Sequence, residues 1–368
     1  MIIMALDHIR DYFHADAFVF DPVDLGKTNV LLFFTRWITN FCAPVFVMLA
    51  GTSAFLAGRR RTQKQLSAFL LTRGLWLVFL ELVVVNFAWF FNIHFSFAIL
   101  AVIWALGVSM MVLAALIHLP RTAILIIGIV LVAGHNLLDN FHVPGSGPEA
   151  VAWAVLHETR AFAFGSWHFM TIYPLLPWIG LMALGYCMGW LYQQNIDPAK
   201  RKRLLWQTGS ACLLLFILLR SVNVYGDLVP WSRPSTPVFS FLSFINVTKY
   251  PPSLDYILLM IGPALLFLAF TEKPLNRFTG VISVYGRVPF FYYMIHIFLI
   301  HVTALFAAAL SGYAWTAMTG FTNWVNYDPR LQGYGFNLGV VYLIWIAIVT
   351  VLYPLCKRYD RYKLEHKD

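Results

Sequence analysis

The residues best suited to chemistry lie near the start of the chain, in the run DHIRDYFH at positions 7–14. Four of them are spaced to share one face of a helix: Asp7, Arg10, Asp11 and His14. A histidine beside carboxylates can act as a general base near neutral pH. Titratable groups are costly near hydrocarbon, so this cluster at the end of an apolar segment indicates function. The alternative is an ion-paired helix end that only anchors the segment.

A second histidine, His8, belongs to the same cluster, since it stands three residues before Asp11. Either imidazole is a candidate for the base, and the carboxylates of Asp7 and Asp11 are candidates to orient it. Arg10 supplies the positive charge of the cluster and is a candidate substrate- or cofactor-binding residue.

The composition is that of a membrane protein. Of the 368 residues, 60% are hydrophobic and only 12% are charged, whereas soluble proteins carry about 25% charged residues. We predict an all-α transmembrane bundle and one integral-membrane domain over residues 1–368, embedded in a lipid bilayer. The expected spans have cores at residues 1–9, 37–58, 68–91, 97–118, 121–138, 170–192, 204–222, 253–271, 287–310 and 337–355. The first is too short to cross the bilayer, so we expect that helix to begin upstream.

The charge pattern predicts the orientation of these spans. The net charge is +9, and most of the 26 Lys and Arg residues cluster in alternate short loops. This asymmetry places both termini in the cytoplasm and His14 on the outer side of a cytoplasmic (inner) membrane. No basic stripe with interleaved aromatic residues is present, so nucleic acid is not an expected partner.

Three other places combine apolar sequence with polar groups. His168 and Tyr173 precede the two prolines of YPLLP, which predict irregular backbone beside a cavity. Tyr292 and His296 stand one helical turn apart within an apolar segment. Arg287 marks the inner end of that segment and suits a phosphate.

Glu81 interrupts an apolar segment two helical turns after Arg73, which makes that arginine a candidate partner. The alternative for Glu81 is a structural polar clamp between helices.

The familiar motifs of metal and nucleotide chemistry are missing from the sequence. It contains no HExxH spacing and no CxxC pair among its four cysteines, so we expect no metal. It also contains no GxGxxG, no P-loop and no GxSxG, which argues against nucleotide hydrolysis and serine hydrolysis.

Five segments, spread over nearly the whole chain, resemble the bacterial relatives of lysosomal heparan-α-glucosaminide N-acetyltransferase. They are IMALDHIRDYFH, FTRWITNFCAPVFVMLAGTSAFL, YPLLPWIGLMALGY, KYPPSLDYILLMIGPALL and GRVPFFYYMIHIFLIH. The resemblance implies a multi-span enzyme that moves an acetyl group from cytoplasmic acetyl-CoA to a sugar amine or hydroxyl across the membrane.

The same resemblance implies that the histidine after the first span is catalytic, which is His14 here. The lysosomal enzyme carries an asparagine near the end of its first span where this chain reads Asp7-His8, so the partner of the histidine and the acceptor are open. Arg36, Tyr292 and His296 are candidate donors to the oxyanion. The CoA phosphates are expected near Arg287, Arg73 or Lys273, and the pantetheine arm in a pore lined by Tyr173 and the proline-kinked spans. The GxxxG motif at 185–189 and the aromatic-rich spans suit a homodimer, but they pack within one chain equally well.

A second function from another class is a proton-coupled transporter or a flippase for a glycan or lipid-linked solute. Its support is the set of titratable residues within apolar segments: Glu81, His135 and His296. The sequence shows no symmetric pair of interrupted spans in two halves, which is the usual pointer to a transporter.

Overall fold

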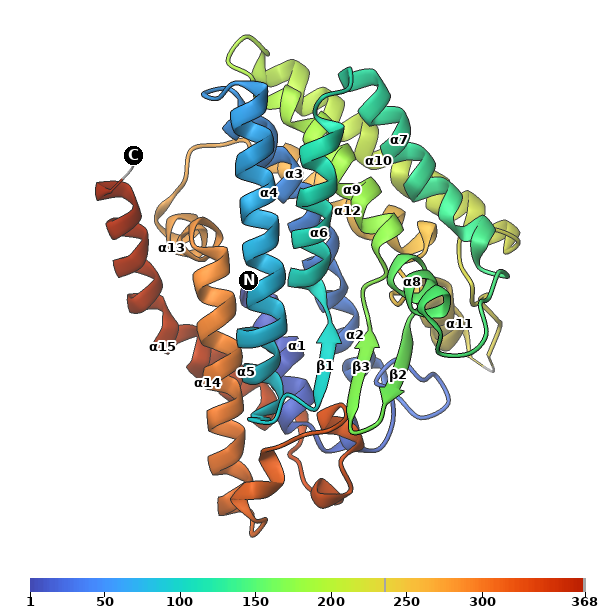
Figure 1. Cartoon of the computed structure of the whole chain (residues 1–368), viewed down its shortest axis with the longest axis vertical. Helices are drawn as coiled ribbons and strands as arrows, with labels where there is room; N and C mark the ends of the chain where they lie inside the picture. The colour runs from blue at the N-terminus through green and yellow to red at the C-terminus, as the bar shows by residue number, and fades with distance from the viewer. Residues whose placement is uncertain (235, 367–368) are drawn as a thin grey trace. The chain divides into compact units, whose positions relative to one another are not determined.

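The computed structural model describes residues 1–234 and 236–366, and these are mostly helical (Figure 1). Each of the ten expected apolar segments contains a helix, which confirms the prediction of a helical protein. In the described residues, seven helices are long and apolar enough to cross a membrane. Two shorter apolar helices cover Val102–Leu116 and Leu254–Phe270. These helices indicate a multi-pass membrane protein, with fewer full-length spans than the ten expected.

The chain packs as two compact units, each made of separate stretches of sequence. The first unit comprises Met1–Cys42, Val84–Phe97 and Lys273–Asp368, and the second comprises Ala43–Val83 and Ala98–Glu272. The single domain expected for the whole chain stays a prediction. The two units are taken in turn below.

The first unit is built on the first helix and the last two long helices. Its main helices are α1 (Ile2–Phe13), α2 (Val30–Trp37), α5 (Asn86–Phe90), α13 (Arg277–Arg287), α14 (Pro289–Leu310) and α15 (Leu338–Glu365). Its short 3₁₀ turns are η1 (Ala15–Phe18), η2 (Ile38–Phe41), η6 (Trp315–Met318), η7 (Val325–Tyr327) and η8 (Pro329–Leu331). Helix α1 packs against α14 and α15. The side chain of Trp345 on α15 donates to the Ile2 carbonyl at 2.8 Å, which fixes the start of α1.

The second unit contains the remaining helices and one small sheet. Its helices are α3 (Cys42–Gly58), α4 (Gln63–Leu80), α6 (Val102–Leu116), α7 (Arg121–Gly134), α8 (Pro148–Leu156), α9 (Leu175–Met188), α10 (Pro198–Val222), α11 (Pro237–Ile245) and α12 (Leu254–Phe270). A π-helical turn, η3 (Glu81–Val85), continues α4, and 3₁₀ turns η4 (His135–Leu138) and η5 (Gly189–Tyr192) extend α7 and α9.

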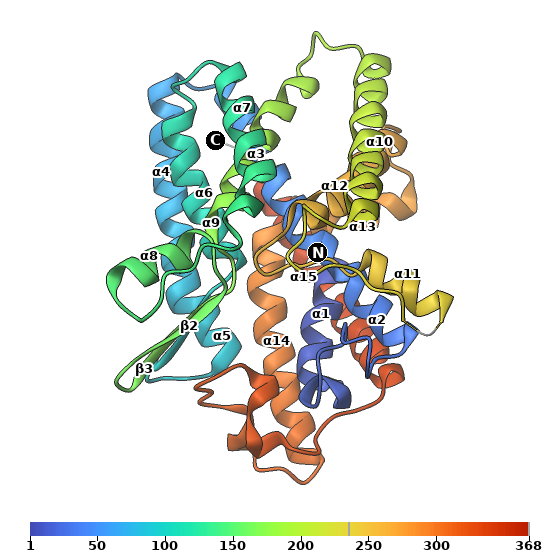
Figure 2. The same ribbon diagram turned by 90° about the vertical axis from the view of Figure 1, so that its right-hand side faces the viewer.

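Facing glycines bring the helices of the second unit into backbone contact. Helices α4 and α6 lie side by side (Figures 1 and 2), and a Cβ added at Gly107 would stand 2.7 Å from the Gly74 carbonyl oxygen. On α10 and α12, a Cβ at Gly209 would stand 2.8 Å from the Gly262 oxygen. Helices that associate in a membrane use small residues to approach this closely.

A β-hairpin departs from the all-α prediction. Strands β2 (Arg160–Phe164) and β3 (Trp167–Thr171) pair antiparallel, and β1 (Phe97–Leu100) completes the sheet in the order β1-β3-β2. Phe162 pairs with Phe169 across the hairpin, and both pack on α8. The turn between the strands uses Gly165 at φ +62°, a conformation that glycine adopts without strain.

The hairpin also corrects two expected span boundaries. Residues 97–100 are a strand, so the helix expected from position 97 begins at Val102. The span expected from position 170 begins at Leu175, and Pro174 precedes the helix with a non-helical ψ of 142°. Pro177 lies in the first turn of α9, where a missing N–H costs no hydrogen bond.

Several helix starts follow local sequence signals. The side chain of Thr62 accepts from the Gln65 N–H, and the Gln65 side chain accepts from the Thr62 N–H, which forms a capping box at α4. Ser253 caps α12 by accepting from the Tyr256 N–H at 3.0 Å.

Candidate functional site

The predicted ionic cluster forms in the second half of α1. The Arg10 guanidinium donates to Asp7 Oδ1 at 2.9 Å and to Asp11 Oδ1 at 2.7 Å. Arg10 is only 3% exposed. A buried charge needs an opposite charge close by, and here the Arg10 guanidinium binds both carboxylates. The shared helical face predicted for Asp7 and Arg10 is confirmed.

A second arginine reaches the same cluster from the end of α2. The Nη1 atom of Arg36 lies 3.7 Å from Asp7 Oδ1. The same atom donates to Thr39 Oγ1 at 3.0 Å and to Asn40 Oδ1 at 2.9 Å. The cluster therefore holds two guanidinium groups against two carboxylates, and its formal charge is balanced.

His14 closes α1 and stands where the chain leaves the helix. The backbone N–H of His14 donates to the Arg10 carbonyl at 3.0 Å. The ψ angle of His14 is 128°, so the chain leaves the helix in an extended conformation. The next residues are pinned by backbone hydrogen bonds, from the Ala15 N–H to the Phe336 oxygen and from the Phe336 N–H to the Phe13 oxygen. Gly335 permits this contact, since its φ is +125° and a Cβ there would lie 2.6 Å from the Ala15 nitrogen.

The imidazole of His14 is buried and suited to accept a proton. It is 4% exposed, and its Nδ1 atom has no hydrogen-bond partner among the described residues. Burial lowers the pKa of His14 below its ordinary value of 6.5; Asp16 opposes this shift and Arg10 adds to it. The imidazole is therefore neutral at pH 7, as a general base must be.

His8 faces a different set of rings in the first unit. Its ring centroid lies 5.2 Å from that of His296 on α14 and 4.8 Å from that of Trp89. His296 in turn stacks on Tyr292 at 5.0 Å. The Nε2 atom of His296 and the hydroxyl of Tyr292 have no hydrogen-bond partner in the described chain, although both are buried. The structure thus brings His8, His296 and Tyr292 into one group.

Arg287, predicted to meet a phosphate, is held by a carboxylate. Its guanidinium donates to Asp360 on α15 at 2.7 and 2.9 Å and to Ser283 Oγ at 2.6 Å. The hydrogen bond to Asp360 raises the pKa of Arg287. The side chain keeps 43% of its surface exposed. The sequence signal for Asp360 was weak, because this residue lies within a charged run at the end of α15.

Three predicted binding residues belong to the second unit. Arg73 is exposed on α4 and stands over the Phe69 ring at 5.3 Å. His168 lies on β3, and Tyr173 follows that strand. The buried Tyr173 ring packs on Trp178 at 5.1 Å and on Tyr250 at 5.5 Å. The roles assigned to these three residues stay predictions.

Glu81, for which Arg73 was the candidate partner, accepts from a backbone donor. Its Oε2 atom receives the Trp104 N–H at the start of α6 at 3.0 Å. The contact ties the end of α4 to α6, as the structural alternative for Glu81 requires.

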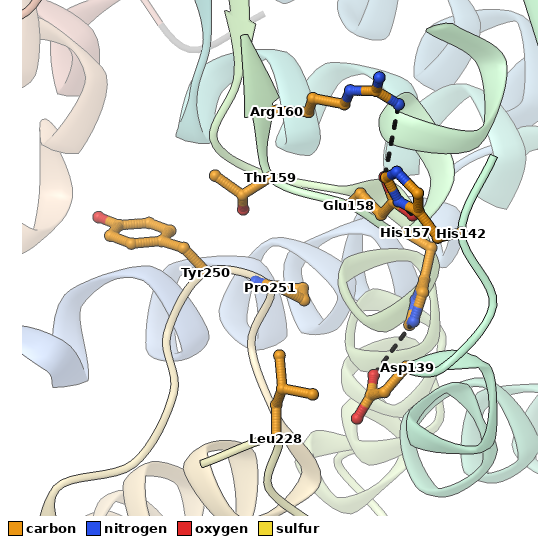
Figure 3. A pocket seen from close by; sticks show the side chains of 9 residues that line it. All are labelled: Asp139, His142, His157, Glu158, Thr159, Arg160, Leu228, Tyr250 and Pro251. Atoms are coloured by element: carbon orange, nitrogen blue, oxygen red, sulfur yellow. Dashed lines mark hydrogen bonds and ion pairs between the residues drawn. The ribbon is translucent and has the colours of Figure 1, made fainter. Parts of the chain in front are cut away.

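The second unit also contains a cavity of about 390 Å³ that the sequence did not reveal. A pocket of this volume lies within the range of small-ligand sites. Figure 3 shows His157 and Asp139 on one side and Tyr250 on the other. The lining residues are Asp139, His142, His157, Glu158, Thr159, Arg160, Leu228, Tyr250 and Pro251.

Two of these lining residues also belong to a group with metal-ligand chemistry. One ligand atom each from His135, Asp139 and His157 lies within 4.8 Å of the others. The pair His135 and Asp139 has the i, i+4 spacing of a helix face, which was the available sequence signal. His157 is distant in sequence, so the group could not be read from the spacing.

The comparisons with known proteins point to one family. The match to heparan-alpha-glucosaminide N-acetyltransferase, catalytic, covers residues 1–231, which includes all of α1 and His14. Among curated proteins and solved structures, no significant match is found. The match spans more than half of the chain, and the chain therefore belongs to the heparan-alpha-glucosaminide N-acetyltransferase catalytic family.

Proposed function

We propose that this protein is a membrane acetyltransferase that moves an acetyl group from cytoplasmic acetyl-CoA to a sugar amine or hydroxyl on the outer face of the cytoplasmic membrane. The observation that carries the proposal is the family match over residues 1–231. Within that region, His14 combines burial, a free Nδ1 atom and a lowered pKa. Family membership by itself implies transferase activity, and the donor, acceptor and direction of transfer are our inference.

In the proposed reaction, His14 accepts the proton of the acceptor amine or hydroxyl as that atom attacks the thioester carbonyl. The new bond joins the acetyl carbon to the acceptor, the C–S bond breaks, and CoA leaves as the thiolate. An alternative route first transfers the acetyl group to His14 and then to the acceptor. Both routes need an unprotonated imidazole, which the burial of His14 favours.

The ionic cluster supports this role by fixing the helix that presents His14. Asp7 and Asp11 both bind Arg10, so their carboxylates hold α1 in place. We assign Asp7 and Asp11 as positioning residues, with His8 as the second candidate base. Donors for the oxyanion are available at the Tyr292 hydroxyl, at His296 and at Arg36, which already binds Thr39 and Asn40.

The first test is transfer and binding with the full chain in detergent or in proteoliposomes. Radiolabelled acetyl-CoA is offered with a glucosaminide, which carries a free amine, and with an N-acetylglucosaminide, which offers only hydroxyls. We expect acetylation of one of the two, and the product identifies N- or O-transfer. Acetyl-CoA at 100-fold over its Kd should also stabilise the fold by about 2.7 kcal/mol. A chain that neither binds acetyl-CoA nor acetylates either sugar contradicts the proposal.

Arg287 gives a matched test of donor binding. Arg287 and Arg330 are exposed to 43% and 44%, and each pairs with an aspartate, Asp360 or Asp328. Loss of a charge-assisted hydrogen bond to a phosphate costs roughly 1.5–3 kcal/mol. We therefore expect Arg287→Ala to weaken acetyl-CoA binding by about 10-fold or more and Arg330→Ala to leave it unchanged. Equal affinity of the two variants for acetyl-CoA would show that Arg287 does not bind the donor.

The same experiment distinguishes the transferase from the alternative function, a transporter. The family match favours a transferase, and Glu81 accepts a backbone N–H at 3.0 Å as a structural clamp would. A transporter of unrelated solutes gains no stability from acetyl-CoA, whereas the transferase does.

A further inference from the structure

A second site with its own chemistry lies in the second unit, where η4 meets the end of α8. His135 and Asp139 come from η4 and the residue after it, and His157 follows α8. One ligand atom of each lies within 4.8 Å of the other two. Within this group, His157 Nε2 lies 3.1 Å from Asp139 Oδ1. Two ligands of one tetrahedral zinc ion stand about 3.4 Å apart, given bond lengths near 2.0–2.1 Å.

The burial of the two histidines is costly without a further partner. His135 and His157 are each 2% exposed. Both ring nitrogens of His135 and the Nδ1 of His157 lack a hydrogen-bond partner within the described residues. A buried polar atom left unsatisfied has lost its hydrogen bonds to water without compensation, which destabilises the fold. A metal ion would take one nitrogen of His135 together with His157 Nε2, and the two imidazoles already approach edge to face, with centroids 5.6 Å apart.

A hydrogen bond from Asn136 orients the Asp139 carboxylate. Asn136 Nδ2 donates to Asp139 Oδ2 at 2.8 Å, which leaves Oδ1 directed to His157. The other end of the Asn136 amide is fixed as well, since its Oδ1 accepts the Leu254 N–H at 2.9 Å. Outer hydrogen bonds of this kind hold ligating carboxylates in metal sites. In the described chain, no arginine or lysine is found within ion-pair distance of Asp139.

We propose that His135, Asp139 and His157 bind one zinc ion, with a fourth coordination position open to the 390 Å³ cavity. Two imidazoles and one carboxylate form a ligand set that Zn²⁺ accepts, and zinc sites with three protein ligands keep one position for water or substrate. Asp139 and His157 line the cavity themselves (Figure 3). The proposal departs from the expectation of no metal, and it does not depend on acetyl transfer.

Glu158 lines the cavity, and its carboxylate suits a water molecule or a polar ligand near the ion. His142 pairs with this carboxylate, its Nδ1 2.8 Å from Glu158 Oε1. His142 is also the matched control for the zinc ligands. It is a histidine of the same cavity, its side chain is 59% exposed, and it lies outside the three-residue group.

The test is zinc binding to the full chain, stripped with a chelator in detergent and dialysed. Zinc chloride is then titrated, with calorimetry and metal analysis as readouts. We expect one zinc per chain in the wild type and in His142→Ala. His135→Ala and His157→Ala should weaken binding at least 100-fold, and Asn136→Ala by about 10–100-fold through the orientation of Asp139.

A spectroscopic readout on the wild type guards against variants that fail to fold. Cobalt(II) replaces zinc in such sites, and a four-coordinate site gives intense visible d–d absorption that zinc then removes. Appearance of this absorption at one equivalent supports the site. The proposal is overturned if the wild type binds no zinc, or if His135→Ala and His157→Ala bind it as tightly as His142→Ala. In either case the group is a metal-free hydrogen bond between His157 and Asp139.

Discussion

Two histidine–carboxylate clusters, one in each unit, differ in what neutralises their carboxylates. At the end of α1, the carboxylates of Asp7 and Asp11 bind Arg10, and Arg36 lies near Asp7. At the end of α7, the described partners of Asp139 are His157 and the Asn136 amide. An arginine satisfies a carboxylate and leaves little of it for a cation.

The difference assigns different chemistry to the two clusters. In the α1 cluster, the carboxylates pair with arginine, and the buried imidazole of His14 keeps an Nδ1 atom without a partner among the described residues. This neutral imidazole suits proton transfer. The α7 cluster leaves imidazole nitrogens and one carboxylate oxygen facing each other, which suits a metal ion. Similar residue types therefore serve two purposes, and the presence of a guanidinium separates them.

Removing Arg10 tests this difference between the clusters with the largest expected effect. Arg10→Met leaves two largely buried carboxylates without their main counter-charge, and breaking a buried pair in this way costs about 3–5 kcal/mol. We expect a loss of this order in the free energy of unfolding in mixed micelles. Lys27→Met is the control, because Lys27 and Asp24 are exposed at 61% and 42% and contribute about 0–1 kcal/mol. Equal stability of the two variants would show that Arg10 does not hold the cluster.

The packing of the second unit is tested at a glycine. A Cβ at Gly107 meets the Gly74 carbonyl at 2.7 Å and Val78 Cγ2 at 2.9 Å, whereas a Cβ at Gly280 on α13 meets nothing within 4 Å. We expect Gly107→Ala to destabilise the fold by about 1–3 kcal/mol through overpacking. Gly280→Ala should stabilise it by about 0.5–1 kcal/mol, because alanine is the better helix former. The same sign for both variants, measured by thermal unfolding, would refute the close contact of α4 and α6.

The pH dependence of acetyl transfer tests whether His14 of the α1 cluster is the base. The expected effect is smaller than that of the substitutions above. Protonated His14 cannot accept a proton, and burial lowers its pKa below 6.5. The rate should therefore rise with pH through a midpoint below 6.5 and stay level above it. The unfolded chain binds the proton more tightly than the folded one, so stability should also fall as the pH drops below 6.5. A midpoint at or above 6.5 in kcat/KM profiles would contradict the assignment.

The sequence predicted the features that depend on local spacing. All ten apolar segments contain helices, and the i, i+3 spacing of Asp7 and Arg10 gave their ion pair. The β2–β3 hairpin was also readable in principle. Alternating phenylalanines at 162 and 164 precede a Gly-Ser turn, a pattern typical of a hairpin, but these residues lie between the spans expected at 121–138 and 170–192 and were interpreted as part of an outer loop.

Contacts between distant segments could not be predicted from one sequence. Arg36 approaches Asp7, His296 approaches His8, and Asp360 holds Arg287 only because the fold brings their helices together. His157 joins His135 and Asp139 for the same reason. Spacing along one helix carries no information about such partners, since each depends on which helices pack side by side.

The central claim is tested most directly by acetyl transfer in His14→Gln, with His118→Gln as the matched control. His118 is an exposed histidine in the loop between α6 and α7. Removal of a general base costs typically 10²–10⁴-fold in rate. We predict a loss of that size in His14→Gln with unchanged affinity for acetyl-CoA, and a wild-type rate in His118→Gln. Transfer by His14→Gln within twofold of the wild-type rate would contradict the account.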